Sequence, residues 1–397
     1  MARIIPIQPL APKTGPALEF KVSPPLSLYI HLPWCVQKCP YCDFNSHASN
    51  TGIPEAAYVA ALIADLQAAL PLIWGRPIHT VFFGGGTPSL FSPEAIDEIL
   101  TAARTLTRLQ PEAEITLEAN PGTVEAARFA GFRAAGVNRL SLGIQSFNDA
   151  HLRALGRVHD AGEARRAAEL AAQHFPTFNL DLMYGLPGQS LAESLADLDS
   201  ALAFAPPHLS CYQLTLEPNT PFAAFPPEVP DGDACADMQD AIEARLAAAA
   251  YGNYETSAFA QAGRQCLHNL NYWQFGDYLG IGAGAHSKLT LHDKVLRQMR
   301  HKHPAAYLEK AASGQAIQKE RAVTHQELPG EFMMNALRLA AGFPPDLFEL
   351  RTSRPLAEIL PILKTAERDG LLELSASAIR PTLRGRRFLN LLIERFL

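Results

Sequence analysis

The sequence predicts an α/β protein: a barrel or partial barrel of six βα units, followed by a helical domain with winged-helix character. Short apolar runs alternate with longer Ala-rich helical stretches between about residues 26 and 216. Polar residues follow these runs in one consistent place. Beyond about residue 305, strand signals become rare and amphipathic helical stretches dominate. A doubly wound sheet is the alternative that periodicity leaves open.

The six predicted strands are LSLYIH, HTVFF, EITLEA, RLSLGI, FNLDLM and LSCYQL, which begin at residues 26, 79, 114, 139, 178 and 209. Helical stretches such as PEAAYVAALIADLQAAL and DAGEARRAAELAAQ separate them. Polar groups or glycines lie at or just beyond the strand ends: His31, Gly84 to Gly86, Glu118, Gln145, Asp181 and Gln213. In a parallel barrel these ends share one face, which holds the active site. Loop starts are often polar, but six in succession favour a functional site.

Three segments are expected along the chain. Residues 1–25 contain six prolines, which prevent regular helix and predict an extended arm outside the fold. Residues 26–290 are predicted to form the barrel, and residues 291–397 the helical domain. A basic cluster in this domain comprises Arg380, Arg384, Arg386 and Arg387. Either a solvated face or peripheral contact with anionic lipid or a partner protein explains such a cluster.

Composition bounds the class of protein. The chain has 397 residues, of which 48% are hydrophobic and 19% charged, and its net charge is −6. These values exclude a disordered or fibrous protein and argue against nucleic acid as a partner. Six cysteines in so long a chain do not suggest a secreted disulfide framework, so we expect a reducing, cytoplasmic compartment. The absence of a long uninterrupted apolar stretch or a leader pattern predicts a soluble protein.

A cysteine loop gives the strongest chemical signal. CVQKCPYC places Cys35, Cys39 and Cys42 in a CxxxCxxC spacing directly after the first predicted strand. Clustered thiolates select zinc or an iron–sulfur cluster. Structural zinc usually takes four protein ligands, and the fourth would have to be one of His31, His47, Cys211, Cys235 and Cys266. A cubane held by three cysteines leaves one iron open, which favours the cluster; structural zinc and incidental thiols are the alternatives.

This loop lies in the segment YIHLPWCVQKCPYCDF, which resembles the opening of the radical S-adenosylmethionine (SAM) proteins, in the branch of oxygen-independent coproporphyrinogen III oxidase. FFGGGTPSLF, TLEANPGT, RLSLGIQSFND, LGRVHD, NLDLMYGLPGQ and YQLTLEPNTPF extend the resemblance over most of residues 26–290. It implies a partial (β/α)6 TIM-like barrel and a 4Fe-4S cluster on Cys35, Cys39 and Cys42, whose open iron binds SAM. Reduced flavodoxin or ferredoxin is the implied electron donor. The implied SAM contacts are Tyr29, Gly85, Gly86, Thr87, Glu118, Gln145, Arg157 and Asp181.

The residue types at these positions suit a zwitterionic nucleoside. Glycines let the backbone approach the methionyl group, since no side chain intervenes. Glu118 and Asp181 can accept hydrogen bonds from ammonium or ribose hydroxyl groups, and Gln145 can donate or accept. Arg157 can pair with a carboxylate. With Arg157 placed on a helix, an ordinary surface salt bridge is the alternative for this residue.

A second segment indicates the branch. CLHNLNYWQFGDYLGIGAGAHS contains His268, Asn269, Tyr272 and Trp273 in an HNxxYW pattern that resembles the signature of HemW-type heme chaperones. The His268 imidazole can ligate heme iron and aromatic rings can cover a porphyrin face, with Cys266 and His286 as further candidate ligands. Alternatively, the rings pack in the barrel wall and His268 makes a structural hydrogen bond. GEFMMNALRL and IRPTLRGRRFLN resemble this branch's C-terminal helical, HemN-type domain.

The resemblance implies a heme chaperone that delivers heme to respiratory or cytochrome-type proteins. One alternative is an oxygen-independent coproporphyrinogen III oxidase, which oxidatively decarboxylates two propionates in a SAM-dependent reaction to give protoporphyrinogen IX. Those enzymes carry a further cysteine where this chain has Phe44, and a long N-terminal extension that the 25-residue arm does not match. A zinc-stabilised binding module without redox chemistry is the second alternative.

Overall fold

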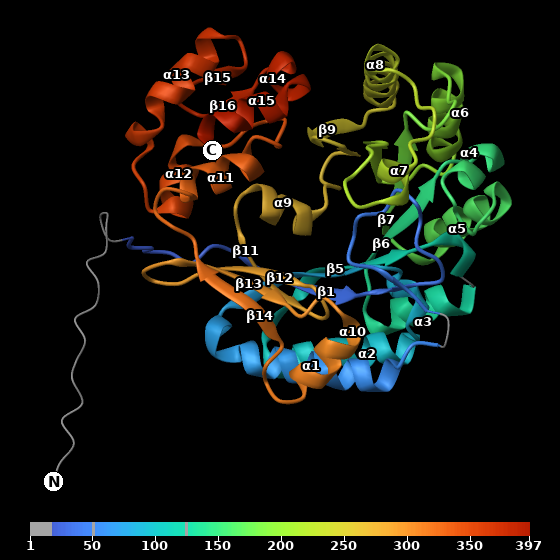
Figure 1. Ribbon diagram of the computed structural model, residues 1–397, viewed down its shortest axis with the longest axis horizontal. Coiled ribbons are helices and arrows are strands. Elements are labelled where there is room, and N and C mark those ends of the chain that lie inside the picture. The colour runs from blue at the N-terminus through green and yellow to red at the C-terminus, as the bar shows by residue number, and fades with distance from the viewer. Residues whose placement is uncertain (1–17, 50–51, 124–125) are drawn as a thin grey trace.

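The computed structural model describes residues 18–49, 52–123 and 126–397. Its centre is a twelve-stranded sheet in the order β14-β13-β12-β11-β1-β4-β5-β6-β7-β8-β10-β9 (Figure 1). All six predicted strands are present and parallel to one another: β1 (Leu26–Leu32), β4 (Pro77–Gly85), β5 (Arg108–Ala119), β6 (Arg139–Gln145), β7 (Thr177–Tyr184) and β8 (His208–Gln213). These strands follow chain order without the reversal of a doubly wound sheet. The predicted partial barrel is therefore confirmed, and the doubly wound alternative is wrong.

Six further strands extend the sheet: β9 (Gly252–Glu255), β10 (Ala258–Ala260), β11 (Asp277–Ile281), β12 (His286–Thr290), β13 (Val295–Arg300) and β14 (Ile317–Ala322). β11 pairs parallel to β1, and β12, β13 and β14 continue antiparallel. The boundary expected after residue 290 falls between β12 and β13. Because β14 still belongs to this sheet, we propose that the boundary lies near Ala322.

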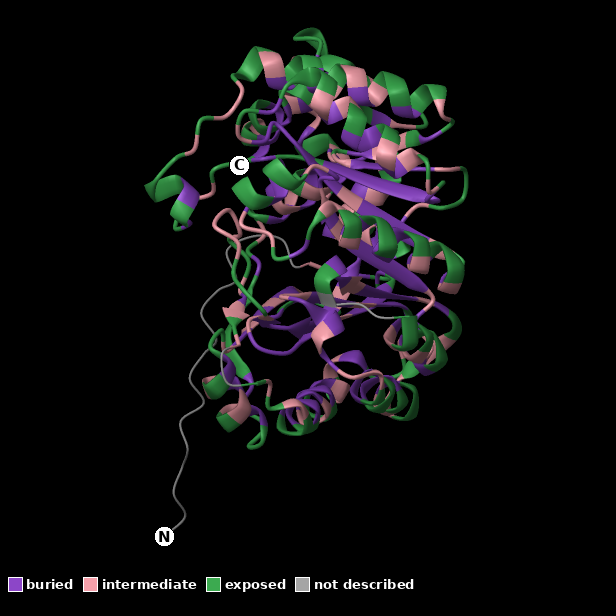
Figure 2. Ribbon diagram, turned by 90° about the vertical axis from the view of Figure 1, so that its right-hand side faces the viewer, coloured by how far each residue is buried: buried purple, intermediate pink, exposed green. Residues whose placement is uncertain are grey.

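Helices cover the sheet and connect its strands: α1 (Glu55–Ile73), α2 (Pro93–Leu106), α3 (Ala126–Ala135), α4 (Asp149–Ala154), α5 (Ala161–His174), α6 (Leu191–Leu202), α7 (Pro221–Ala224), α8 (Gly232–Ala248), α9 (Leu267–Trp273) and α10 (Pro304–Ala311). Figure 2 shows the buried strands between helices whose outer faces are exposed. By length and composition α1 could cross a membrane. Tyr58, Leu62 and Leu66 of α1 are buried in the main core, which accounts for its apolar character.

The C-terminal unit has its own hydrophobic core. It contains α11 (Leu328–Ala336), α12 (Pro345–Thr352), α13 (Leu360–Arg368), the hairpin of β15 (Leu372–Leu374) and β16 (Ile379–Pro381), α14 (Leu383–Arg387) and α15 (Leu389–Ile393). Single turns of 3-10 helix are η1 (Pro88–Leu90), η2 (Pro121–Thr123), η3 (Leu356–Glu358) and η4 (Glu394–Phe396). Helices followed by a small hairpin agree with the predicted winged-helix character.

The basic cluster of this unit is largely paired within the chain. Arg380 forms an ion pair with Glu373 on the neighbouring strand. Arg387 pairs with Asp240, and Arg386 lies 3.9 Å from a carboxylate oxygen of Glu243; both acids are on α8. The contacts of Arg386 and Arg387 with α8 link the C-terminal unit to the barrel.

Part of the predicted N-terminal arm belongs to the fold. Residues 1–17 lie outside the described residues. Phe20 is buried in the C-terminal core, and its backbone N–H donates to the carbonyl of His292 at 2.9 Å. Glu19 exchanges two hydrogen bonds of 2.9 Å with the Ser353 hydroxyl. The expectation that the arm stands outside the fold therefore does not hold for its last residues.

Candidate cofactor-binding site

The cysteine loop leaves the carboxyl end of β1. Two short strands, β2 (Trp34–Cys35) and β3 (His47–Ala48), pair in parallel and close it. Cys35, Cys39 and Cys42 are half-buried and free of disulfides. The Thr87 hydroxyl donates to Cys35 Sγ at 3.5 Å, and Cys42 Sγ lies 3.8 Å from Ser46 Oγ. The loop thus presents three thiols that are already in contact with polar neighbours.

The donor set fits an iron–sulfur cluster better than structural zinc. Burial raises the pKa of the Cys35 thiol, and the nearby thiols of Cys39 and Cys42 add to the shift. Structural zinc usually takes four protein ligands, whereas this loop supplies three cysteines. Cys211, Cys235 and Cys266 are buried, on β8, on α8 and at the start of α9. Three thiolates suit a cluster with one open iron.

Two glycines beside the loop cannot be replaced without movement. Gly85 has a φ of +118°, and a Cβ there would lie 2.5 Å from His31 Cε1. A Cβ on Gly86 would lie 2.4 Å from the carbonyl oxygen of Trp34, which is backbone and cannot rotate away. The structure therefore places the end of β4 directly against the start of the cysteine loop.

A chain of hydrogen bonds joins Arg157 to the cysteine loop. Arg157 Nη2 donates to Asn120 Oδ1 at 2.6 Å, and Asn120 Nδ2 donates to Thr87 Oγ1 at 2.8 Å. Thr87 in turn donates to Cys35, while Arg157 Nη1 lies 3.7 Å from Cys39 Sγ. Outer hydrogen bonds of this kind orient metal ligands. Asn120 lies in the TLEANPGT motif, but the sequence does not identify it as a site residue, because its partner Arg157 lies 37 positions away.

The expected helical position of Arg157 is wrong. α4 ends at Ala154, and Arg157 lies in the turn before α5. The Arg157 N–H closes this turn by donating to the carbonyl of Leu152 at 2.9 Å, and the capping box of Asp160 and Glu163 begins α5 directly after it. Arg157 Nη2 also donates to the carbonyl of Gly143 at 2.8 Å. The guanidinium therefore points into the site, so the surface salt bridge does not apply.

Two buried carboxyl groups lie near the ends of parallel strands: Glu118 on β5 and Asp181 on β7. Burial and the charge of Asp181 raise the pKa of Glu118 to about 8, although the Gly85 N–H donates to Glu118 Oε2 at 3.2 Å. Burial also raises the pKa of Asp181, which accepts hydrogen bonds from Ser141 at 3.1 Å and Asn179 at 2.8 Å. Neither acid has a cationic side chain within ion-pair distance among the described residues. A cationic ligand bound beside these carboxyl groups would favour their ionised forms.

Tyr29 and Gln145 complete the predicted set. The Tyr29 hydroxyl lies 2.9 Å from His31 Nδ1, and burial raises the pKa of this phenol. Gln145, the last residue of β6, has a φ of +66°, a conformation that non-glycine residues rarely adopt. A Cβ on Gly143 would lie 3.0 Å from Gln145 Nε2 and 3.4 Å from Arg157 Nη2, so these two side chains are neighbours.

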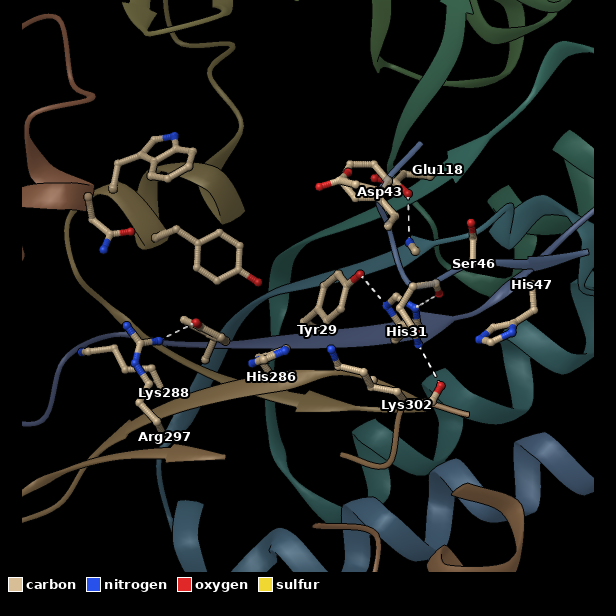
Figure 3. A pocket seen from close by; sticks show the side chains of 18 of the residues that line it. Tyr29, His31, Asp43, Ser46, His47, Glu118, His286, Lys288, Arg297 and Lys302 are labelled. Atoms are coloured by element: carbon tan, nitrogen blue, oxygen red, sulfur yellow. Dashed lines mark hydrogen bonds between the residues drawn. The ribbon is translucent and has the colours of Figure 1, made fainter. Parts of the chain in front are cut away.

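A cavity of about 750 Å³ opens beside these residues, within the roughly 300–1,000 Å³ usual for small-molecule sites (Figure 3). The cysteine loop, the ends of β1, β4 and β5, helices α9 and α11, and the β11–β13 ribbon surround it. Its lining residues are Tyr29, His31, Lys38, Asp43, Phe44, Asn45, Ser46, His47, Gly85, Glu118, Asn219, Tyr272, Trp273, Phe275, Gly276, Tyr278, Gly284, His286, Lys288, Arg297, Lys302 and Asn335. Aromatic and basic groups dominate this lining.

His268 does not line the cavity. Its side chain is 1% exposed. Its Nδ1 lies 2.7 Å from Thr80 Oγ1, and its Nε2 lies 3.0 Å from the Tyr272 hydroxyl. Tyr272 and Trp273 do line the cavity. This arrangement matches the alternative in which His268 makes structural hydrogen bonds; its axial role toward heme stays a prediction.

Comparison with known proteins agrees with this geometry. The family model of the radical SAM superfamily matches residues 29–200, and that of the HemN C-terminal domain matches residues 323–388. The fold, the three-cysteine loop and these matches define a radical SAM protein. Heme chaperone HemW of Haemophilus influenzae is 50% identical over 380 residues, 94% of this chain and 98% of that protein; HemW of Escherichia coli K12 is 50% identical over 376 residues, with the same coverage. The chain belongs to the HemW family.

A solved structure shares the complete fold. Coproporphyrinogen III oxidase (HemN) from Escherichia coli superposes with a TM-score of 0.80 at 24% identity, covering 94% of this chain and 90% of that chain. At this identity the likeness shows the fold, including the C-terminal unit, and not the reaction. Radical SAM proteins carry a 4Fe-4S cluster and SAM, and the thiols and glycines described above fit both groups.

Proposed function

We propose that this protein is a heme chaperone, which binds heme in the cavity beside the cysteine loop and delivers it to a heme-receiving respiratory or cytochrome-type protein. The observation that carries the proposal is the cavity itself. Tyr272 and Trp273 of the HNxxYW helix offer aromatic rings to a porphyrin. Lys38 and Lys302 offer cations to its propionates. The 50% identity to curated HemW proteins supports the same function.

Cofactor contacts within this site are part of the proposal. Cys35, Cys39 and Cys42 would hold the cluster, which with SAM supplies one-electron chemistry when both are bound. Glu118 and Asp181 would accept hydrogen bonds from the SAM ammonium or ribose, and Arg157 would face its carboxylate. Tyr29, Gly85, Gly86, Thr87 and Gln145 would shape the pocket around them. Their support is mutual proximity at the ends of β1, β4, β5, β6 and β7.

The decarboxylase alternative has less support. Phe44 occupies the position of the additional cysteine and is 66% exposed in the cavity wall. The likeness to HemN carries the fold alone. We propose a cytoplasmic location and a reduced flavodoxin or ferredoxin as electron donor. Peripheral membrane contact has weaker support, because Arg380, Arg386 and Arg387 have acidic partners within the chain.

Heme transfer tests the proposed function directly. Cluster-loaded protein carrying heme should convert an apo b-type cytochrome to its holo form faster than serum albumin carrying heme does, measured by the rise of the cytochrome's Soret band. The same anaerobic sample, given coproporphyrinogen III, SAM and a reductant, should leave the propionates intact. Decarboxylated porphyrinogen without heme transfer would overturn the proposal in favour of the oxidase.

Glu118 provides a pH-dependent test of the SAM contacts. With a pKa of about 8, the ionised fraction of this carboxyl rises about tenfold between pH 6 and pH 7. Since the SAM amino group remains protonated there, SAM affinity should rise by up to about tenfold across this interval. Glu118→Gln should abolish the rise, whereas Glu112→Gln, at an exposed position on β5, should keep it. Calorimetric titration under anaerobic conditions measures this; pH-independent affinity in the unmodified protein would exclude the contact.

A further inference from the structure

The proposed heme site needs a nitrogen ligand that faces the cavity. His268 is a poor source, because it is buried and both of its ring nitrogens lie within hydrogen-bond distance of a side-chain hydroxyl, from Thr80 on β4 and Tyr272 on α9. Releasing Nε2 would break its contact with the partly buried Tyr272 hydroxyl, and releasing Nδ1 would break the buried contact with Thr80. In this packing His268 holds Tyr272 in the cavity wall.

His286 meets the requirement that His268 does not. It is the first residue of β12, where it pairs with Met299 of β13, and its side chain is exposed toward the cavity. Among the described residues neither of its ring nitrogens has a hydrogen-bond partner. Figure 3 shows its ring below Tyr29, with Lys288 and Arg297 on one side and Lys302 on the other. Both ring nitrogens of His286 are therefore available to bind a ligand in the cavity.

The electrostatic surroundings suit a metal ligand. Partial desolvation, together with the charges of Lys302 and Arg297, lowers the pKa of His286 and so favours the neutral imidazole. A neutral imidazole has the lone pair that heme iron requires. Arg297 is already bound to Glu331, at 2.6 Å, and to the Tyr278 hydroxyl, at 2.7 Å. Lys302 has no ion-pair partner among the described residues, and it lines the same cavity.

We propose that His286 is the axial ligand of the heme iron, and that Lys302 beside it receives a propionate. Aromatic residues of the cavity wall, Tyr272, Trp273 and Tyr278, would contact the porphyrin. In this arrangement His268 is a positioning residue that acts through Tyr272. The inference rests on the proposed heme-chaperone function and identifies the iron ligand within that same site.

Replacement of His286 tests the ligand with two probes. His286→Ala should weaken binding of ferric heme at least tenfold and remove the low-spin or imidazole-ligated signature from its absorption and resonance Raman spectra. Binding of metal-free protoporphyrin IX should change less than twofold, since that molecule forms no axial bond. Added free imidazole should restore the ligated spectrum. His292→Ala, in the turn between β12 and β13 and outside the cavity, is the matched control and should match the unmodified protein.

The outcomes separate the inference from the function on which it rests. Unmodified protein that binds no heme would contradict the proposed function. Unmodified protein that binds heme, with an unchanged ligated spectrum in His286→Ala, would overturn the ligand assignment alone. Equal loss of heme and metal-free porphyrin in His286→Ala would likewise overturn it, because the side chain would then shape the cavity without ligating iron. His268→Ala should retain the ligated signature.

Discussion

Replacing any one of Cys35, Cys39 and Cys42 with Ala should remove the iron–sulfur cluster from the purified protein. A cubane with three protein ligands has no spare thiolate, and the other three cysteines are buried in other elements of the barrel. Bound iron and sulfide should therefore fall to background after anaerobic reconstitution, and the broad visible absorption of the cluster should disappear. SAM should no longer perturb the electron paramagnetic resonance signal of the reduced protein.

Cys235→Ala is the matched control, because Cys235 is buried on α8 and its thiol lies 3.7 Å from the carbonyl of Pro230. It should retain full iron and sulfide and the SAM-dependent spectral change. Equal loss of iron in Cys235→Ala would contradict the ligand assignment. Stoichiometric zinc in place of iron in the reconstituted unmodified protein would instead favour a structural zinc site.

Local patterns account for what was predictable about the site. The cysteine spacing lies within eight consecutive residues, so its chemistry could be inferred without knowing the fold. The strand ends of the parallel units were predictable for a similar reason, since each buried strand is a short apolar run between turn residues. Topology then brought Gly85, Glu118 and Asp181 to one face, as expected for parallel strands.

Interactions between distant segments account for what sequence reasoning missed. β12 and β13 were not predicted because Lys288 and Arg300 interrupt their apolar pattern. Both cations are buried, and each is compensated by an acid from another element: Lys288 by Asp277 at 3.0 Å and Arg300 by Asp65 at 3.2 Å. Similarly, the HNxxYW spacing predicts neighbouring side chains but not their direction. Contact with Thr80, 188 positions away, places the His268 ring outside the cavity.

The cavity wall depends on one of these buried pairs. β12 and β13 contribute His286, Lys288 and Arg297 to the lining, and they reach the core helix α1 through Arg300. The carboxylate of Asp65 also accepts a hydrogen bond from the Tyr307 hydroxyl at 3.0 Å. An ion pair between α1 and β13 therefore supports the strands on which the proposed heme ligand lies.

Asp65→Ala should lower the free energy of unfolding by about 3–5 kcal/mol, because it leaves the Arg300 guanidinium buried without a counter-charge. The double variant Asp65→Leu/Arg300→Met should recover part of this loss, since no buried charge is left unpaired. The recovery should be incomplete, because the Tyr307 hydroxyl and the Gly282 N–H lose their shared acceptor. The control Asp199→Ala removes an exposed pair with Arg245 and should cost about 0–1 kcal/mol. Urea unfolding followed by circular dichroism measures all three variants. A decrease in the free energy of unfolding below about 1 kcal/mol in Asp65→Ala would contradict the prediction that this ion pair supports β12 and β13.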